Sequence, residues 1–222
     1  MSRVLKGAVI FLTTWVLIAS SILIGLTWWN NRQTSALVDT KLEAMVRHPV
    51  TEEMWKTAGS FKDLAAPSFR LPDVNGKLWA LHEIAKGRPA VLYFIKYGCP
   101  CSIDVEPLLQ KMSKQIGSKV AFVGIIETET KATKAWIEDM KSPFPVLMDP
   151  STETMKIFKA RQSVYTALIR PDGAIDKLWP GYSASMLREL YSRATILAGV
   201  KATSFDPDYA PIKMTSGCEF YD

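Results

Sequence analysis

The sequence predicts an α/β fold, in which helices flank a mixed sheet, preceded by one N-terminal membrane segment. Three observations support this. Strand-like runs alternate with helix-like segments between residues 90 and 197, and the last two strand-like runs are joined by a Pro171-Asp172-Gly173 turn, which is typical of a hairpin. Residues 7–29 are apolar and uncharged. A chain of 222 residues has room for one ordinary domain and an attachment segment.

The N-terminal segment, residues 7–29, is predicted to be a transmembrane anchor. A helix of this length crosses a bilayer core of roughly 30 Å, and Trp28 and Trp29 are placed as an interfacial anchor. A cleaved signal peptide ending near residues 19–21 is the alternative, but the apolar run continues well past that point. We therefore expect domain boundaries at 1–29 for the anchor, 30–60 for a stalk, 61–199 for the globular domain and 200–222 for a tail.

The stalk, residues 30–60, is expected to be a juxtamembrane helical segment. A short apolar stripe ends before His48-Pro49, because the residue before a proline avoids the helical region. Thr51, followed by Glu52 and Glu53, is a suitable start for a second helix. The segment is either a plain spacer or a surface that docks against a membrane partner.

The domain that follows has a regular order of predicted elements. Apolar and β-branched runs predict strands at 90–95, 120–126, 144–148, 164–169 and 174–179. Apolar residues at helical spacing predict helices after residue 99, at 127–140, at 152–159 and after Ser183. Residues 200–222 have no periodicity and are expected to form an extended tail.

Two of the three cysteines, Cys99 and Cys101, lie where the predicted strand 90–95 gives way to a helix. Unpaired backbone N–H groups and the helix dipole stabilise a thiolate at such a position. Pro100 suits the first helical position, because it has no N–H to lose there. The junction is therefore a suitable site for thiol chemistry.

Several segments, in this order, resemble the thioredoxin-like redoxins, which include peroxiredoxins and membrane-anchored thiol–disulfide oxidoreductases. The resemblance spans residues 66–190 and rests on Ala66-Pro-Ser-Phe-Arg-Leu-Pro-Asp73 with Asn75-Gly-Lys77, the cysteine turn within 91–107, Phe144-Pro-Val-Leu-Met-Asp-Pro150 and Ala167-Leu-Ile-Arg-Pro-Asp-Gly173. It implies a thioredoxin-like fold and a domain on the periplasmic, extracytoplasmic side of the membrane. The slight charge bias across the anchor gives only a weak preference for a cytoplasmic N-terminus.

The cysteine turn departs from the family's Cys-x-x-Cys pattern. By the resemblance, Cys99 matches the nucleophilic cysteine and Ser102 occupies the place of the second. We expect Ser102 to point toward Cys99 and to bond its thiolate, and Cys101 to be rotated away. A Cys99–Cys101 disulfide would be strained and easily reduced. Cys101 and Cys218, on a tail that can reach back, are the candidate resolving thiols.

Two further departures concern the later strand and the peroxidase reaction. Tyr165 stands where the family has a cis-proline, and a non-proline cis bond costs about 2.5–4 kcal/mol, so a trans bond is expected. Lys96 and Val164 occupy the positions of a peroxiredoxin's Thr or Ser and arginine. The resemblance therefore disfavours a thiol peroxidase, although Lys96 could still lower the pKa of Cys99.

Composition and spacing argue against several other classes. The net charge of +5 carries no basic cluster interleaved with aromatics, so nucleic-acid binding has no support. No Cys/His spacing suggests zinc or haem, and His48 and His82 both precede the cysteine turn, in the wrong pattern for a copper chaperone. We expect no metal, no nucleotide and no other cofactor.

The leading hypothesis is a membrane-anchored thiol–disulfide oxidoreductase whose nucleophile is Cys99, with a protein partner in or at the membrane. The opposing hypothesis is a redoxin fold retained as a non-catalytic accessory subunit of a membrane complex. The altered cysteine turn, the missing cis-proline, the stalk and the tail suit that second hypothesis.

Overall fold

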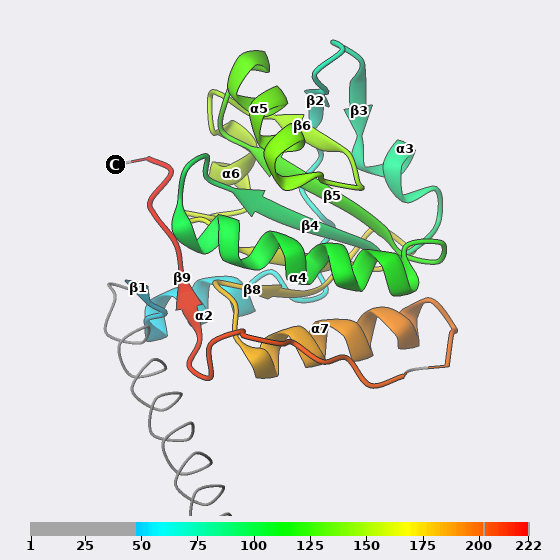
Figure 1. The fold of residues 1–222 in the computed structure, drawn as a ribbon. Helices are drawn as coiled ribbons and strands as arrows, with labels where there is room; N and C mark the ends of the chain where they lie inside the picture. The colour runs from blue at the N-terminus through cyan, green and yellow to red at the C-terminus, as the bar shows by residue number, and fades with distance from the viewer. Residues whose placement is uncertain (1–47, 202, 222) are drawn as a thin grey trace, which may run out of the picture. The chain divides into compact units, whose positions relative to one another are not determined.

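The computed structural model describes residues 48–201 and 203–221. Its centre is a five-stranded sheet in the order β6-β5-β4-β7-β8 (Figure 1). The strands are β4 (Ala90–Ile95), β5 (Ala121–Ile126), β6 (Val146–Met148), β7 (Thr166–Ile169) and β8 (Ile175–Trp179). β4, β5 and β6 run parallel to one another, whereas β7 and β8 are antiparallel additions beside β4. The predicted mixed sheet is confirmed.

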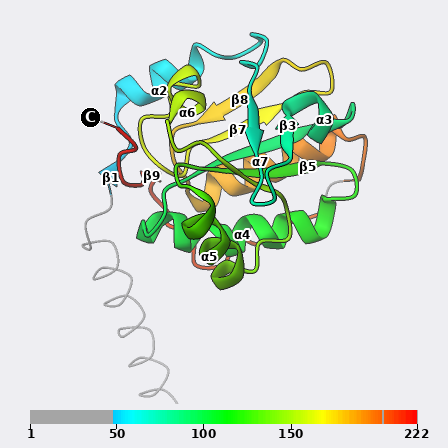
Figure 2. The same ribbon diagram turned by 90° about the horizontal axis from the view of Figure 1, so that it is seen from above.

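Helices cover both faces of this sheet (Figures 1 and 2). One face carries α4 (Pro100–Ile116), α5 (Thr130–Met140) and α7 (Ala184–Leu197). The other face carries α2 (Glu52–Gly59), α3 (Leu81–Ala85) and α6 (Glu153–Ile157). A hairpin of β2 (Arg70–Pro72) and β3 (Leu78–Ala80) precedes the strands of the central sheet. Every helix predicted between residues 51 and 199 is present, and only the short α3 was missed.

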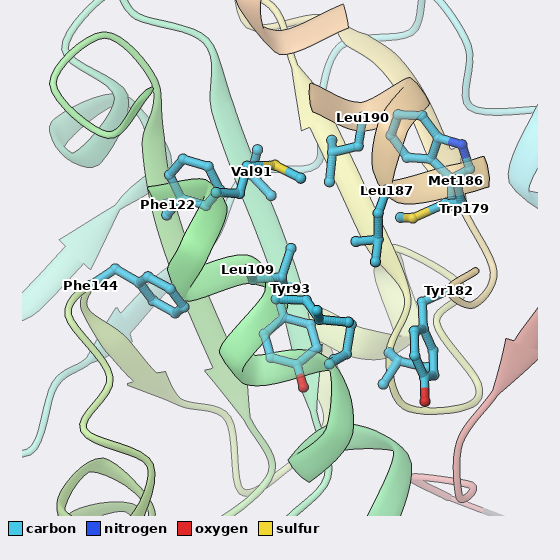
Figure 3. Close-up of a cluster of buried hydrophobic side chains, with 14 of the residues drawn as sticks. Val91, Tyr93, Leu109, Phe122, Phe144, Trp179, Tyr182, Met186, Leu187 and Leu190 are labelled. Carbon is cyan, nitrogen blue, oxygen red and sulfur yellow. The ribbon is translucent and has the colours of Figure 1, made fainter. Parts of the chain in front are cut away.

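The side chains of β4 divide the apolar core into two clusters. All six residues of β4 are buried, and because neighbours in a strand point to opposite faces, they alternate between the two cores. Val91 and Tyr93 pack with α4 and α7, where Figure 3 shows them beside Leu109, Leu187 and Leu190. Leu92 and Phe94 pack on the opposite face with α2, α3 and α6. The centre of the sheet is therefore rigid on both sides.

The caps of two helices are those that the sequence predicts. The Thr51 hydroxyl accepts a hydrogen bond from the Met54 N–H at 3.2 Å and so starts α2. The Ser183 hydroxyl accepts from the Met186 N–H, also at 3.2 Å, and starts α7.

The chain before residue 61 is part of the domain wherever it is described. β1 (His48–Pro49) pairs with β9 (Thr215–Ser216). Ala58 of α2 is buried in the second core, the apolar cluster that contains Leu92 and Phe94. The domain therefore begins before the boundary expected at residue 61. The rest of the predicted stalk and the predicted anchor, 7–29, lie outside the described residues. Among residues 48–201 and 203–221, no helix is both long and apolar enough to cross a membrane.

The C-terminal tail is extended, as predicted, but it is packed against the domain. β9 lies between β1 and the segment at Tyr182, whose backbone N–H and C=O both bond to Thr215 at 2.8 and 3.0 Å. A Cβ on Gly181 would lie 2.3 Å from the Thr215 carbonyl oxygen. Only glycine therefore permits this close approach of the tail.

We predict that Gly181→Ala destabilises the domain by about 1–3 kcal/mol, because the added Cβ pushes the backbone of β9 outward. Urea unfolding of the full chain, followed by fluorescence, measures the change. Gly59→Ala is the matched control, since a Cβ there meets no atom within 4 Å. Equal stability of the two variants would show that the tail does not contribute to the folded domain.

Candidate functional site

The cysteine turn connects the buried strand β4 to the first turn of α4. Cys99 is the residue that caps α4, and its N–H donates to the Lys96 carbonyl at 3.2 Å. Pro100 occupies the first turn, as predicted, and the Ile103 N–H donates to the Cys99 carbonyl at 3.1 Å. The Cys99 side chain makes no capping bond to the helix, so its thiolate is held by other groups.

The Cys99 sulfur receives hydrogen bonds from three segments of the chain. The Ser163 hydroxyl, just before β7, donates to Cys99 Sγ at 3.3 Å. The backbone N–H of Cys218, on the tail, donates to the same sulfur, also at 3.3 Å. Cys101, in the first turn of α4, and the Cys218 side chain also lower the pKa of Cys99 through hydrogen bonding. The residue is 2% exposed, so protein groups take the place of water around the sulfur.

These donors set the protonation of the three thiols. The hydrogen bond from Cys101 is the main reason that the pKa of Cys99 falls to about 3, and bonds from Cys218 and Ser163 add to it against the opposing effect of burial. The pKa of Cys101 is raised, because its thiol donates to Cys99 and is buried. Burial, together with the bond to Cys99, raises the pKa of Cys218 to about 11. The cluster thus contains one thiolate and two thiols near neutral pH.

Two expectations for the cysteine turn are wrong. The Ser102 hydroxyl does not bond to Cys99 but accepts a hydrogen bond from the Lys96 N–H at 3.1 Å. Ser102 therefore supports the backbone that leads into the turn. Cys101 is not rotated away, because its thiol bonds to the Cys99 sulfur. Side chains in the first helical turn adopt rotamers that ideal helical spacing does not predict.

Lys96 is paired with Glu127, at the end of β5. The ammonium group lies 3.8 Å from the Glu127 carboxylate, which also accepts the Tyr97 N–H at 3.0 Å. Glu127 is therefore the group that fixes the backbone ahead of Cys99. Lys96 lowers the pKa of Cys218, although burial and Cys99 outweigh this effect.

The strand leading into β7 has an unusual backbone beside the cysteines. Val164 has a φ of +61°, which is strained for a β-branched residue at a cost of roughly 1–3 kcal/mol. Its N–H donates to the Phe94 carbonyl at 2.9 Å, and the Phe94 N–H donates to the Tyr165 carbonyl at 3.0 Å. These bonds to the rigid strand β4 hold the conformation. No cis peptide bond occurs in the described residues, so the bond before Tyr165 is trans, as predicted.

The tail brings the third cysteine to the site. The Ser163 N–H donates to the Cys218 carbonyl at 2.9 Å, and the Gly217 N–H donates to the Ser163 carbonyl at 3.1 Å. These bonds place Cys218 against Cys99, across 119 residues of sequence. None of the three cysteines forms a disulfide. The tail reaches back to Cys99, as expected, and the structure brings Cys99, Cys101 and Cys218 together, whereas the Ser102 hydroxyl bonds to the Lys96 N–H.

Three contributors to the site were missed from the sequence: Ser163, Glu127 and Gly217. Ser163 and Glu127 are single polar residues at strand ends, and nothing in their spacing points to a cysteine. Gly217 immediately precedes Cys218, and this is the one signal that could have been used.

The described residues contain no group of three or more His, Cys, Asp or Glu side chains that could hold a metal. His48 is part of β1 and His82 of α3, so neither histidine belongs to β4 or α4, the elements that flank the cysteine turn.

Comparison with known proteins gives one family and a set of similar folds. Residues 63–178, just over half of the chain, match the AhpC/TSA family. The thioredoxin-like protein YneN of Bacillus subtilis is 27% identical over 132 residues, which cover 57% of this chain and 66% of YneN. The match thus spans slightly less than two thirds of that relative.

Among solved structures, a protein from Bacteroides thetaiotaomicron provisionally described as a disulfide isomerase is 19% identical, with a TM-score of 0.57, over 62% of this chain and 90% of that one. A protein from Chlorobium tepidum provisionally described as the thiol:disulfide interchange protein DsbE is also 19% identical, with a TM-score of 0.56, over 62% and 96% of the two chains. At these identities the similarity establishes the fold. Together with the family match, it confirms the predicted resemblance: this chain belongs to the AhpC/TSA family and has the thioredoxin-like fold of the redoxins.

Proposed function

We propose that this protein is a thiol–disulfide oxidoreductase in which Cys99 is the nucleophile and Cys99 with Cys218 forms the redox pair. The observation that carries the proposal is the pair of donors at the Cys99 sulfur, the Cys218 backbone N–H and the Ser163 hydroxyl, each at 3.3 Å. The thiolate, and not the thiol, attacks disulfides. The exchange requires a thiolate that attacks the disulfide and a second thiol that resolves the product. A thiolate beside two protonated thiols supplies both.

The proposed reaction reduces a partner disulfide in two exchanges. The Cys99 thiolate attacks one sulfur of that disulfide, forms a mixed disulfide and releases the other sulfur as a thiolate. Cys218 then passes its proton to the partner thiolate already released and attacks the Cys99 sulfur, which breaks the mixed disulfide and releases the second partner thiolate. The partner gains two electrons and the protein ends with a Cys99–Cys218 disulfide; the same steps in reverse oxidise a partner dithiol.

Cys218 is favoured over Cys101 as the resolving thiol. Cys101 lies in the first turn of α4, separated from Cys99 only by Pro100, so a disulfide between them closes a tight ring against the helix. Cys218 comes from a separate extended segment, which can approach without unwinding α4. It is also the more exposed of the two, being half-buried where Cys101 is buried.

The proposal includes attachment to a membrane by residues 7–29, with the domain on the extracytoplasmic side and a protein partner in or at the membrane. The uncharged run of residues 7–29, bounded by Trp28 and Trp29, supports the attachment. Stable disulfide chemistry is common outside the cytoplasm, which supports the placement of the domain.

One observation favours the non-catalytic accessory subunit as a second candidate. Cys99 is only 2% exposed, so in this conformation a large partner does not reach its sulfur. An accessory subunit would co-purify with a membrane complex in fixed stoichiometry, and Cys99→Ser would not change its yield. Loss of partner exchange in the Cys99→Ser variant would instead support the oxidoreductase.

We predict that Cys99 is alkylated by iodoacetamide at a rate that stays constant from about pH 8 down to about pH 5. Its pKa is lowered to about 3, so the thiolate disappears only as the pH falls toward that value. Cys218, with a pKa of about 11, gains reactivity only as the pH rises toward 11. The reduced full chain is labelled at each pH and the sites are separated by fragmentation mass spectrometry. A Cys99 midpoint near the ordinary thiol value of about 8.5 would contradict the proposal.

Ser163→Ala is expected to move the Cys99 midpoint upward by about 1–2 pH units, because it removes one hydrogen bond to a charged sulfur. The same labelling series measures the shift when it is extended below the wild-type pKa of about 3. Ser118→Ala, on an exposed turn, is the matched control and leaves the midpoint in place. An unchanged midpoint in Ser163→Ala would show that the Ser163 hydroxyl does not stabilise the Cys99 thiolate.

Single serine variants identify the redox pair. In a glutathione redox titration, we expect the wild type and Cys101→Ser to lose two hydrogens by forming the Cys99–Cys218 disulfide. Cys99→Ser is expected to lower insulin disulfide reduction to the uncatalysed background, whereas Cys218→Ser accumulates a Cys99 mixed disulfide. A disulfide that persists in Cys218→Ser without glutathione attached would identify Cys101 as the resolving thiol instead.

A further inference from the structure

The tail lies on the domain as an added strand next to the Cys99 sulfur. Besides the two bonds between Ser163 and the tail, the Phe220 N–H donates to the Arg161 carbonyl at 2.9 Å, and Gln162 is opposite Glu219 in an antiparallel bridge. Residues 161–163 therefore form an edge that pairs with an extended segment. We call this the 161–163 edge.

Each tail residue on this edge has a distinct environment. The Ser216 hydroxyl donates to Gln162 Oε1 at 2.6 Å. Glu219 lies 3.6 Å from the Arg161 guanidinium, in an exposed ion pair. Phe220 is buried in the second core. The segment is thus recognised by a polar contact, a charge and an aromatic anchor in addition to its backbone.

Gly217 is the tail position with the least space for a side chain. A Cβ at this position would lie 1.9 Å from Ser163 Oγ and 3.1 Å from Cys99 Sγ. The site therefore has no space for a side chain directly before the cysteine that faces Cys99. This steric constraint applies to any segment that presents a cysteine to Cys99 in the same pairing.

From this we propose that the 161–163 edge is the docking site for an extended segment of the partner protein that carries glycine directly before its reactive cysteine and an aromatic residue two positions after it. The inference rests on the proposed function, since it names the class of its substrate. Residues Gly217–Phe220 are the internal occupant of the same edge.

Access to Cys99 then depends on exchange between the two occupants. The tail covers the sulfur of Cys99, a residue that is 2% exposed, so the partner segment reaches this sulfur only after the tail leaves the edge. Backbone pairing gives such an edge affinity, and the side-chain environments give it selectivity. The tail thereby excludes thiols and disulfides that cannot compete for the 161–163 edge.

Binding of a redox-inert peptide tests the proposal without any thiol chemistry. The probe is fluorescein-labelled Thr-Ser-Gly-Ser-Glu-Phe-Tyr, which copies the tail with serine in place of cysteine; its partner probe has valine in place of glycine. The full chain carries Gly217→Val, which removes its own tail from the edge. We expect this chain to bind the glycine probe at least tenfold more tightly than the wild type does, and at least tenfold more tightly than it binds the valine probe.

Gly59→Val is the matched control chain, because a Cβ there meets no atom within 4 Å, and it should bind like the wild type. Phe220→Ala, which removes only the buried anchor of the tail, is a second releasing variant in case Gly217→Val does not fold. Equal affinity for the two probes, equal affinity of wild-type and released chains, or no binding to a released chain would each overturn the proposal. None of these outcomes depends on Cys99 reactivity, so failure of the alkylation experiment remains a separate result.

Discussion

The site depends on the hydrogen bonds that stabilise one buried thiolate. Cys99 is almost fully removed from water, and a charge in that position is costly unless polar groups compensate it. The compensation comes from the first turn of α4, from Ser163 ahead of β7 and from the tail. Three distant segments must therefore converge on one sulfur, and much of the local architecture follows from that requirement.

The rigid sheet is what makes this convergence possible. β4 is buried on both faces and holds the cysteine turn at its end, while its continued pairing with residues 164 and 165 places Ser163 beside Cys99. The same pairing holds Val164 in a strained conformation. Strain of this kind persists where the surroundings fix the backbone, and such positions cluster at functional sites.

In the proposed mechanism the tail is both the source of the resolving thiol and the occupant of the 161–163 edge. Both follow from one pairing, since the bonds that deliver the Cys218 N–H to the Cys99 sulfur also cover that sulfur. Stabilisation of the Cys99 thiolate and access to it are therefore opposed. The conformation that best stabilises the thiolate is the one in which the tail covers it, and a partner must displace the tail. A redoxin built in this way would be reactive toward few partners.

The sequence by itself determined the mixed α/β fold, the strand 90–95, the caps Thr51 and Ser183 and the placement of Cys99 at a helix start, because these follow from local periodicity and capping chemistry. It misjudged Cys101 and Ser102, whose orientations depend on side-chain packing and not on helical spacing. The contacts of Ser163, of Glu127 and of the Cys218 N–H could not be predicted, because each joins residues 30 to 119 positions apart. Only the tertiary structure decides such contacts, since a hydrogen bond between distant segments leaves no pattern in the sequence of either one.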